Sequence, residues 1–95
     1  MDPPGEWYSG TVRHEPPFAT RRFRHPATGE EVILSVHVVH PPGGPFHDVE
    51  TARPDRSPVP GIMFSTWAKS RDHAREVWRR RERELRAAGY VRDEG

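Results

Sequence analysis

The stretch Ser70–Gly89, SRDHAREVWRRRERELRAAG, decides the fold that this sequence predicts, because its periodicity is the clearest in the chain. On a helical wheel at ~100° per residue, its apolar side chains fall within a sector of ~100°, the width of one buried helix face. These side chains are Ala74, Val77, Trp78, Leu85 and Ala88. Ser70 is a favourable N-cap, and Gly89 supplies the left-handed residue that ends many helices. We therefore expect one long C-terminal helix with a single apolar face, which needs a second surface to pack on.

The strongest strand pattern lies at Glu31–Val39 and predicts that surface. Successive side chains of a strand point to opposite faces of the sheet. One face of this segment is entirely apolar and carries Val32, Leu34, Val36 and Val38. The other face is mixed and carries Glu31, Ile33, Ser35, His37 and Val39. We expect the valine face to pack under the helix and the mixed face to be half-exposed.

A hairpin is predicted just before this strand. Residues 26–29, Pro-Ala-Thr-Gly, are typical of a four-residue loop. This loop length places Phe23 opposite Val32, whereas a five-residue loop would turn the neighbouring arginines toward the apolar face. The preferred register puts Arg22 and Arg24 on the outer face, near His37.

The remaining segments complete a single α+β domain over residues 1–95: a small antiparallel sheet of three to four strands, with the long C-terminal helix packed on one face. Further short strands are expected at residues 7–13, 46–51 and 61–67, and the polar segment 46–51 is expected at a sheet edge. Pro/Gly-rich loops are expected at 40–45 and 52–61, and the second is predicted to be long and exposed. Residues 1–5 and 92–95 are expected to be frayed tails.

Composition limits the function classes. The chain has no cysteine, which excludes disulfides, thiolate metal sites and cysteine nucleophiles. The N-terminal residues show neither a signal peptide nor a membrane span, so a cytoplasmic protein without a membrane partner is expected. The net charge is only +1, so any nucleic-acid binding has to rest on a local patch.

Two groups of basic side chains are the candidate anion-binding residues. On the outer sheet face, Arg22 and Arg24 accompany His37, with Trp7 or Tyr8 on a possible neighbouring strand. On one flank of the helix, four arginines recur at a spacing of four residues: Arg71, Arg75, Arg79 and Arg83. Arg81 falls inside the apolar sector instead, where its stem packs and its guanidinium reaches out, stacks on Trp78, meets a facing acid or binds an anion.

Three functions follow as hypotheses. The first is a non-catalytic binding module for DNA or RNA that uses both arginine groups. The second is an interaction or assembly subunit, in which the same arginines meet an acidic protein partner, or the edge strand 46–51 pairs with another chain. The third is a small nuclease-like enzyme with Arg22, Arg24, Glu31 and His37 on the sheet.

No cofactor and no metal site are expected. The set His37, His40, His47 and Asp48 matches no established pattern of metal ligands. Acid–base pairs such as Asp48 with Glu50 occur on any polar strand, because alternate residues share a face, and the chain has no glycine-rich phosphate loop or nucleophile elbow.

The ending FSTWAKSRDHAREVWRRRERELRAAGY, residues 64–90, resembles the strand and helix that close WGR domains and the arm-binding modules of integrases. Both of these families bind nucleic acid. The resemblance covers under a third of the chain, and the Trp-Gly-Arg strand that defines the first family is absent, so membership in neither family is inferred.

Overall fold

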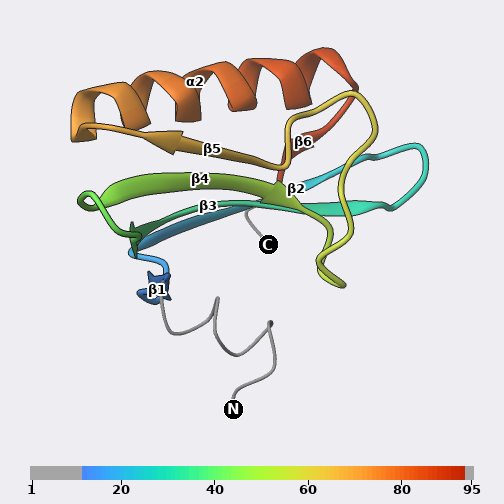
Figure 1. The fold of residues 1–95 in the computed structure, drawn as a ribbon. Helices are drawn as coiled ribbons and strands as arrows, with labels where there is room; N and C mark the ends of the chain where they lie inside the picture. The colour runs from blue at the N-terminus through green and yellow to red at the C-terminus, as the bar shows by residue number, and fades with distance from the viewer. Residues whose placement is uncertain (1–11, 94–95) are drawn as a thin grey trace.

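A computed structural model describes residues 12–93 as one antiparallel sheet with a single long helix on one face (Figure 1). The strands run in the order β5-β4-β3-β2-β6, and β1 also pairs with β3. Their bounds are β1 Arg13–His14, β2 Ala19–Arg24, β3 Glu31–His40, β4 Phe46–Ala52, β5 Ser65–Ala68 and β6 Val91–Arg92. The predicted α+β class is confirmed, but the sheet has more strands than the three to four expected.

The helix α2, Arg71–Ala87, forms where its periodicity predicts it. The Ser70 side chain accepts a hydrogen bond from the backbone N–H of His73 at 3.1 Å, which satisfies one of the free donors at the helix N-terminus. Gly89 has φ +98°, and the Tyr90 N–H donates back to the Leu85 carbonyl at 2.9 Å. Both ends of α2 are therefore fixed by the residues that the sequence indicated.

The core lies between α2 and the face of β3 that was expected to be buried. Val77 and Leu85 of the helix are fully buried, and Trp78 packs at the margin of the same cluster. The sheet contributes Phe23, Val32, Leu34, Val36 and Val49 to this cluster. A single layer of aliphatic side chains between sheet and helix is thus the main source of hydrophobic stabilisation.

The β2–β3 hairpin has the predicted four-residue register. Phe23 is opposite Val32, Arg22 is opposite Ile33, and Arg24 is opposite Glu31. The His25 N–H donates to the Glu30 carbonyl at 2.9 Å and closes the loop. Arg22 and Arg24 consequently lie on the face of the sheet that points away from the helix.

Several local predictions are wrong. Residues 46–51 belong to an interior strand, because β4 pairs with β3 on one side and with β5 on the other. Val38, which was expected in the core, is only partly buried. Val39, which was expected on the half-exposed face, is fully buried. The outer face of β3 is covered near the end of the strand, where His14 and Phe46 are the neighbours of Val39 in the sheet.

Loops connect β3 to β4 and β4 to β5 where they were predicted, but the second loop and the C-terminal tail differ in detail. The segment after β4 is not simply exposed, because Val59 is buried and joins the core. The last strand before the helix starts at Ser65 rather than at residue 61, and Arg92 belongs to β6 instead of a frayed tail. The strand expected at residues 7–13 lies almost entirely outside the described residues.

Within residues 12–93, the one helix is too short and too polar to cross a lipid bilayer.

Candidate functional site

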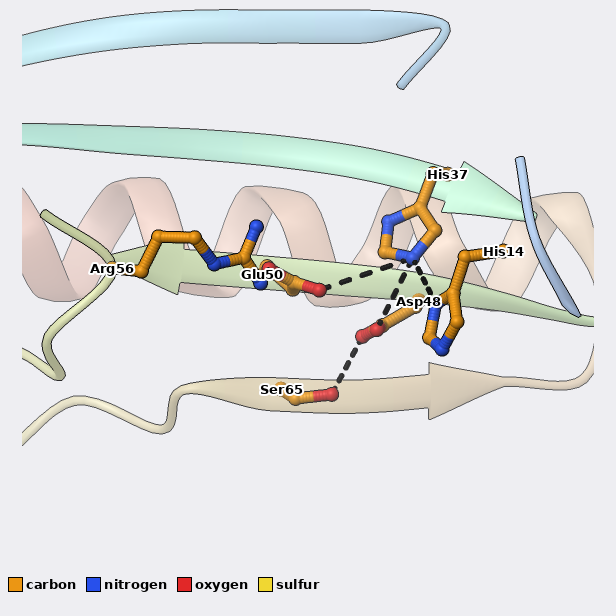
Figure 2. Close-up of polar contacts among 6 residues, drawn as sticks. All are labelled: His14, His37, Asp48, Glu50, Arg56 and Ser65. Atoms are coloured by element: carbon orange, nitrogen blue, oxygen red, sulfur yellow. Dashed lines mark hydrogen bonds and ion pairs between the residues drawn. The ribbon is translucent and has the colours of Figure 1, made fainter. Parts of the chain in front are cut away.

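Polar side chains from five segments converge on the outer face of the sheet, opposite the helix (Figure 2). The sheet register explains the convergence: His37 of β3 is opposite Asp48 of β4, and Glu50 follows two residues later on the same face. Ser65 of β5 is opposite Glu50. His14 reaches the group from β1, and Arg56 reaches it from the segment after β4. We call these six residues the outer-face cluster: His14, His37, Asp48, Glu50, Arg56 and Ser65.

The cluster is centred on the Nε2 atom of His37. This nitrogen lies 3.0 Å from His14 Nδ1, 3.6 Å from Asp48 Oδ2 and 3.8 Å from Glu50 Oε2. The other oxygen of each carboxylate has a separate partner. Ser65 Oγ donates to Asp48 Oδ1 at 2.6 Å, and Arg56 donates to Glu50 Oε1 at 3.2 Å. Each carboxylate is thereby oriented with one oxygen toward the same imidazole.

Burial makes the cluster electrostatically unusual. His37 is 6% exposed, Asp48 2% and Glu50 9%, whereas the Arg56 side chain is 73% exposed. Burial is the main cause that lowers the pKa of His37, so its imidazole is neutral at pH 7. Burial raises the pKa of Glu50, and hydrogen bonding and repulsion from Asp48 raise it further. Groups whose charged forms are disfavoured in this way concentrate at functional sites.

A cavity of about 280 Å³ opens beside the cluster. It is lined by His14, Glu15, Pro17, Ser35, His37, Glu50 and Arg56. The cluster is therefore accessible to water and to small solutes despite the burial of its acids.

A second hollow lies on the other side of the sheet, between the N-terminal half of α2 and the beginnings of β2 and β4. This hollow, which we call the helix-side groove, has a volume of about 180 Å³. Its lining is Phe18, Ala19, Val36, His47, Arg71, Ala74, Arg75 and Trp78. Phe18, one of these lining residues, is 56% exposed. Two of the predicted helix arginines, Arg71 and Arg75, thus border an aromatic groove.

The structure does not unite the two predicted arginine groups, because Arg22 and Arg24 lie on the face opposite the helix. Arg22 is exposed and pairs with Glu31 at 3.4 Å. Arg79 and Arg83 continue along the helix and are exposed, beyond the lining of the helix-side groove.

Arg81 is accounted for by packing. It is 4% exposed, and its guanidinium donates to Glu84 at 2.9 Å and to Thr66 at 3.1 Å. The facing acid that the sequence suggested is thus replaced by an acid on the same helix and a hydroxyl on β5. These two hydrogen bonds give most of the buried guanidinium group of Arg81 a partner within the fold.

The grouping of histidines that the sequence suggested is only partly present. His37 and Asp48 meet, but His40 pairs with Glu15 and His47 lies on the helix side against Phe18. The predicted nuclease set is also dispersed, because Glu31 lies six residues from His37, roughly 20 Å along the extended strand. His14 was missed, since no local pattern at residue 14 shows that β1 pairs with the end of β3.

Comparison of the chain with known protein families, curated proteins and solved structures finds no match.

Proposed function

We propose that this protein binds single-stranded nucleic acid in the helix-side groove. The observation that carries the proposal is that two arginines and two aromatic side chains border one apolar hollow: Arg71, Arg75, Phe18 and Trp78. Proteins that bind single strands combine cationic side chains, which follow the phosphates, with aromatic side chains on which bases stack.

The composition of the groove suits a base more than it suits a small ion. Its lining includes the apolar side chains Ala19, Val36 and Ala74 and the exposed ring of Phe18. Arg79 and Arg83 extend the positive charge along the helix for further phosphates. The nearby acid Asp72 is 95% exposed and 3.9 Å from Arg75, so solvent weakens its competition for that arginine.

Of the two predicted arginine groups, the one on the outer sheet face is the weaker candidate for binding nucleic acid. Arg22 and Arg24 are exposed there, but the same face holds the buried carboxylates Asp48 and Glu50, which repel phosphate. We therefore assign the principal contacts to Arg71 and Arg75, and a supporting electrostatic role to Arg22 and Arg24. The proposal includes a cytoplasmic location, where such a ligand is available.

An acidic protein partner would engage the same helix arginines and is an outcome that the experiment separates. The strand pairing once expected of residues 46–51 is closed to such a partner, since β4 is paired on both sides. Single-stranded DNA and RNA supply flat bases for Phe18, whereas polyglutamate supplies charge alone. Tighter binding of nucleic acid than of polyglutamate at equal salt is therefore expected.

The test is fluorescence anisotropy with a labelled single-stranded oligonucleotide of about 12 nucleotides, titrated at several salt concentrations. Affinity should fall steeply with salt, and the double substitution of Arg71 and Arg75 by Ala should reduce the slope by about 1.4, near 0.7 per phosphate contact. Phe18→Ala should weaken binding by about 1–3 kcal/mol. Arg80→Ala, which removes an exposed arginine from the opposite flank, is the matched control.

Absence of oligonucleotide binding at low salt would refute the proposal. Equal losses for Arg80→Ala and for the groove variants would show general charge attraction rather than a groove. Preference for polyglutamate would favour the acidic protein partner.

A further inference from the structure

We propose that the outer-face cluster is a binding site for a divalent first-row transition metal ion, with Zn²⁺ as the ion that fits it best. The ligands are His14 Nδ1, His37 Nε2, Asp48 Oδ2 and Glu50 Oε2. This site is separate from the helix-side groove and does not depend on nucleic-acid binding.

The spacing of the donor atoms carries the inference. The ligand atoms of His14, His37 and Asp48 all lie within 4.8 Å of one another. Zinc binds histidine nitrogens and carboxylate oxygens at about 2.0–2.2 Å, so the ligand atoms of a tetrahedral site are about 3.4 Å apart. The separations from His37 Nε2 are 3.0, 3.6 and 3.8 Å, on either side of that value. His14, His37 and Asp48 therefore already form a set of three ligand atoms, and a movement of the Glu50 side chain toward the other two would complete the site.

The contacts around the ligands give independent support. In metal sites, carboxylate ligands are held by outer hydrogen bonds that fix their orientation. Ser65 holds Asp48 Oδ1 and Arg56 holds Glu50 Oε1, so the oxygens left over are the two that face His37. A surface cluster of acids would lack this arrangement of inner and outer partners.

The charges of the buried carboxylates Asp48 and Glu50 also favour a bound cation. Of the two buried carboxylates, Glu50 pairs with Arg56, which is mostly exposed, and Asp48 accepts a hydrogen bond from the hydroxyl of Ser65. Glu15 also borders the cavity, but it pairs with His40. A divalent cation would neutralise the two carboxylates at the place where their free oxygens meet.

The donor types select the ion. Two imidazoles and two carboxylates suit zinc, iron, manganese or cobalt, whereas Ca²⁺ and Mg²⁺ prefer sites made of oxygen only and Cu⁺ prefers sulfur. The cavity beside the cluster leaves room for a water molecule or a small anion on the metal. Because His14 belongs to β1, the ion would also tie this two-residue strand to the centre of the sheet.

The experiment uses the full chain after treatment with EDTA and its removal. Zn²⁺ is titrated calorimetrically, and Co²⁺ is added in parallel because its visible absorption reports nitrogen and oxygen ligands in a four-coordinate site. We expect one ion per chain, a Co²⁺ spectrum typical of tetrahedral coordination, and a rise of Tm in Zn²⁺, because an ion bound only by the folded state stabilises it.

The decisive variant is His14→Ala. His14 is exposed, so its removal should leave the fold and the circular dichroism spectrum unchanged. It should weaken Zn²⁺ binding by at least about tenfold and reduce the Co²⁺ absorption. Asp48→Asn should do the same. His40→Ala, which removes a surface histidine paired with Glu15, is the matched control and should leave binding unchanged.

The proposal is overturned if the wild-type chain binds no Zn²⁺, or if His14→Ala and His40→Ala lower the affinity equally. An octahedral Co²⁺ spectrum that all variants share would likewise show surface binding only.

Discussion

Replacing Glu50 by Gln should make the metal-free protein more stable and at the same time weaken metal binding. The substitution keeps the shape of the side chain and an oxygen for Arg56, but it removes one of two buried negative charges. A residue that served only the fold would show the opposite behaviour, because its loss would reduce stability. The variant therefore separates a functional role of the outer-face cluster from a structural one.

The magnitude follows from the geometry of the cluster. Asp48 Oδ2 and Glu50 Oε2 lie 3.6 and 3.8 Å from the same nitrogen, so they are at most 7.4 Å apart. At an effective dielectric constant of about 20, two charges at that distance repel by about 2 kcal/mol. The ion pair between Glu50 and the exposed Arg56 stabilises the fold by no more than about 1 kcal/mol, and the substitution loses this contribution. The net gain for Glu50→Gln is about 1 kcal/mol, or about 4–8 °C in Tm for a domain of this size.

The gain should depend on pH in a defined direction. The pKa of Glu50 is raised in the folded state from 4.5, first by burial and then by Asp48. The stability that its protonated form provides is present below the unfolded pKa and is lost as the pH rises through the folded pKa. The advantage of Glu50→Gln should therefore be small at pH 5 and larger at pH 8.

The assay is thermal unfolding followed by circular dichroism in EDTA at both pH values, with Zn²⁺ calorimetry on the same samples. Glu31→Gln is the matched control, because it makes the same change at a half-exposed glutamate on the same face. An equal or lower Tm for Glu50→Gln at pH 8, together with unchanged Zn²⁺ affinity, would refute both the electrostatic reasoning and the assignment of Glu50 as a ligand.

Three further predictions concern the fold. Leu85→Ala, in the centre of the helix–sheet core, should cost about 3 kcal/mol and lower Tm by more than about 10 °C in a thermal melt, because it leaves a cavity. Gly89→Ala should cost about 1–3 kcal/mol in urea unfolding, since φ is +98° and a Cβ would lie 2.6 Å from His25 Nε2. Gly29→Ala, with positive φ and open space, should cost less. Arg81→Met should stay within about 1 kcal/mol of wild type, whereas Arg81→Ala should cost more, because the methionine keeps the packing of the buried stem.

The parts of the fold that the sequence predicted depend on local rules. The helix follows from one apolar stripe between Ser70 and Gly89, and the hairpin register follows from the four-residue loop and the need to bury Phe23 beside Val32. The first signal spans only a few helical turns, and the second lies within a single hairpin. They hold in the structure because the tertiary contacts reinforce the local preference.

The predictions that were wrong concern residues whose environment depends on pairing between distant segments of the chain. The segment 46–51 looked like an edge because its side chains are polar, but Asp48 and Glu50 are polar because they belong to the outer-face cluster. Val39 looked half-exposed because a two-layer fold leaves the outer face open. In the structure β1 pairs with the end of β3 and lies on the side of the sheet opposite the helix (Figure 1).

The same contrast explains why His14 escaped prediction. A ligand set on one helix or one strand leaves a fixed spacing in the sequence, whereas this cluster draws on β1, β3, β4, β5 and the segment after β4. His37 and Asp48 were identifiable as polar residues on alternating strands, but their partner is 23 positions from His37 in the chain. Only the register of three strands brings them together.

The two faces of β3 show why the outer-face cluster is better explained by a ligand than by stability. On the helix side, Val32, Leu34 and Val36 gain free energy simply by leaving water. On the outer side, the neighbouring strand buries two acids instead, and burying charges without full compensation costs free energy that apolar side chains at the same positions would not cost. Val39, on the same side of β3, shows that an apolar residue is accommodated there. A cation that is held by the free oxygens of Asp48 and Glu50 removes this cost, and that compensation is the physical basis for expecting metal binding to stabilise the chain.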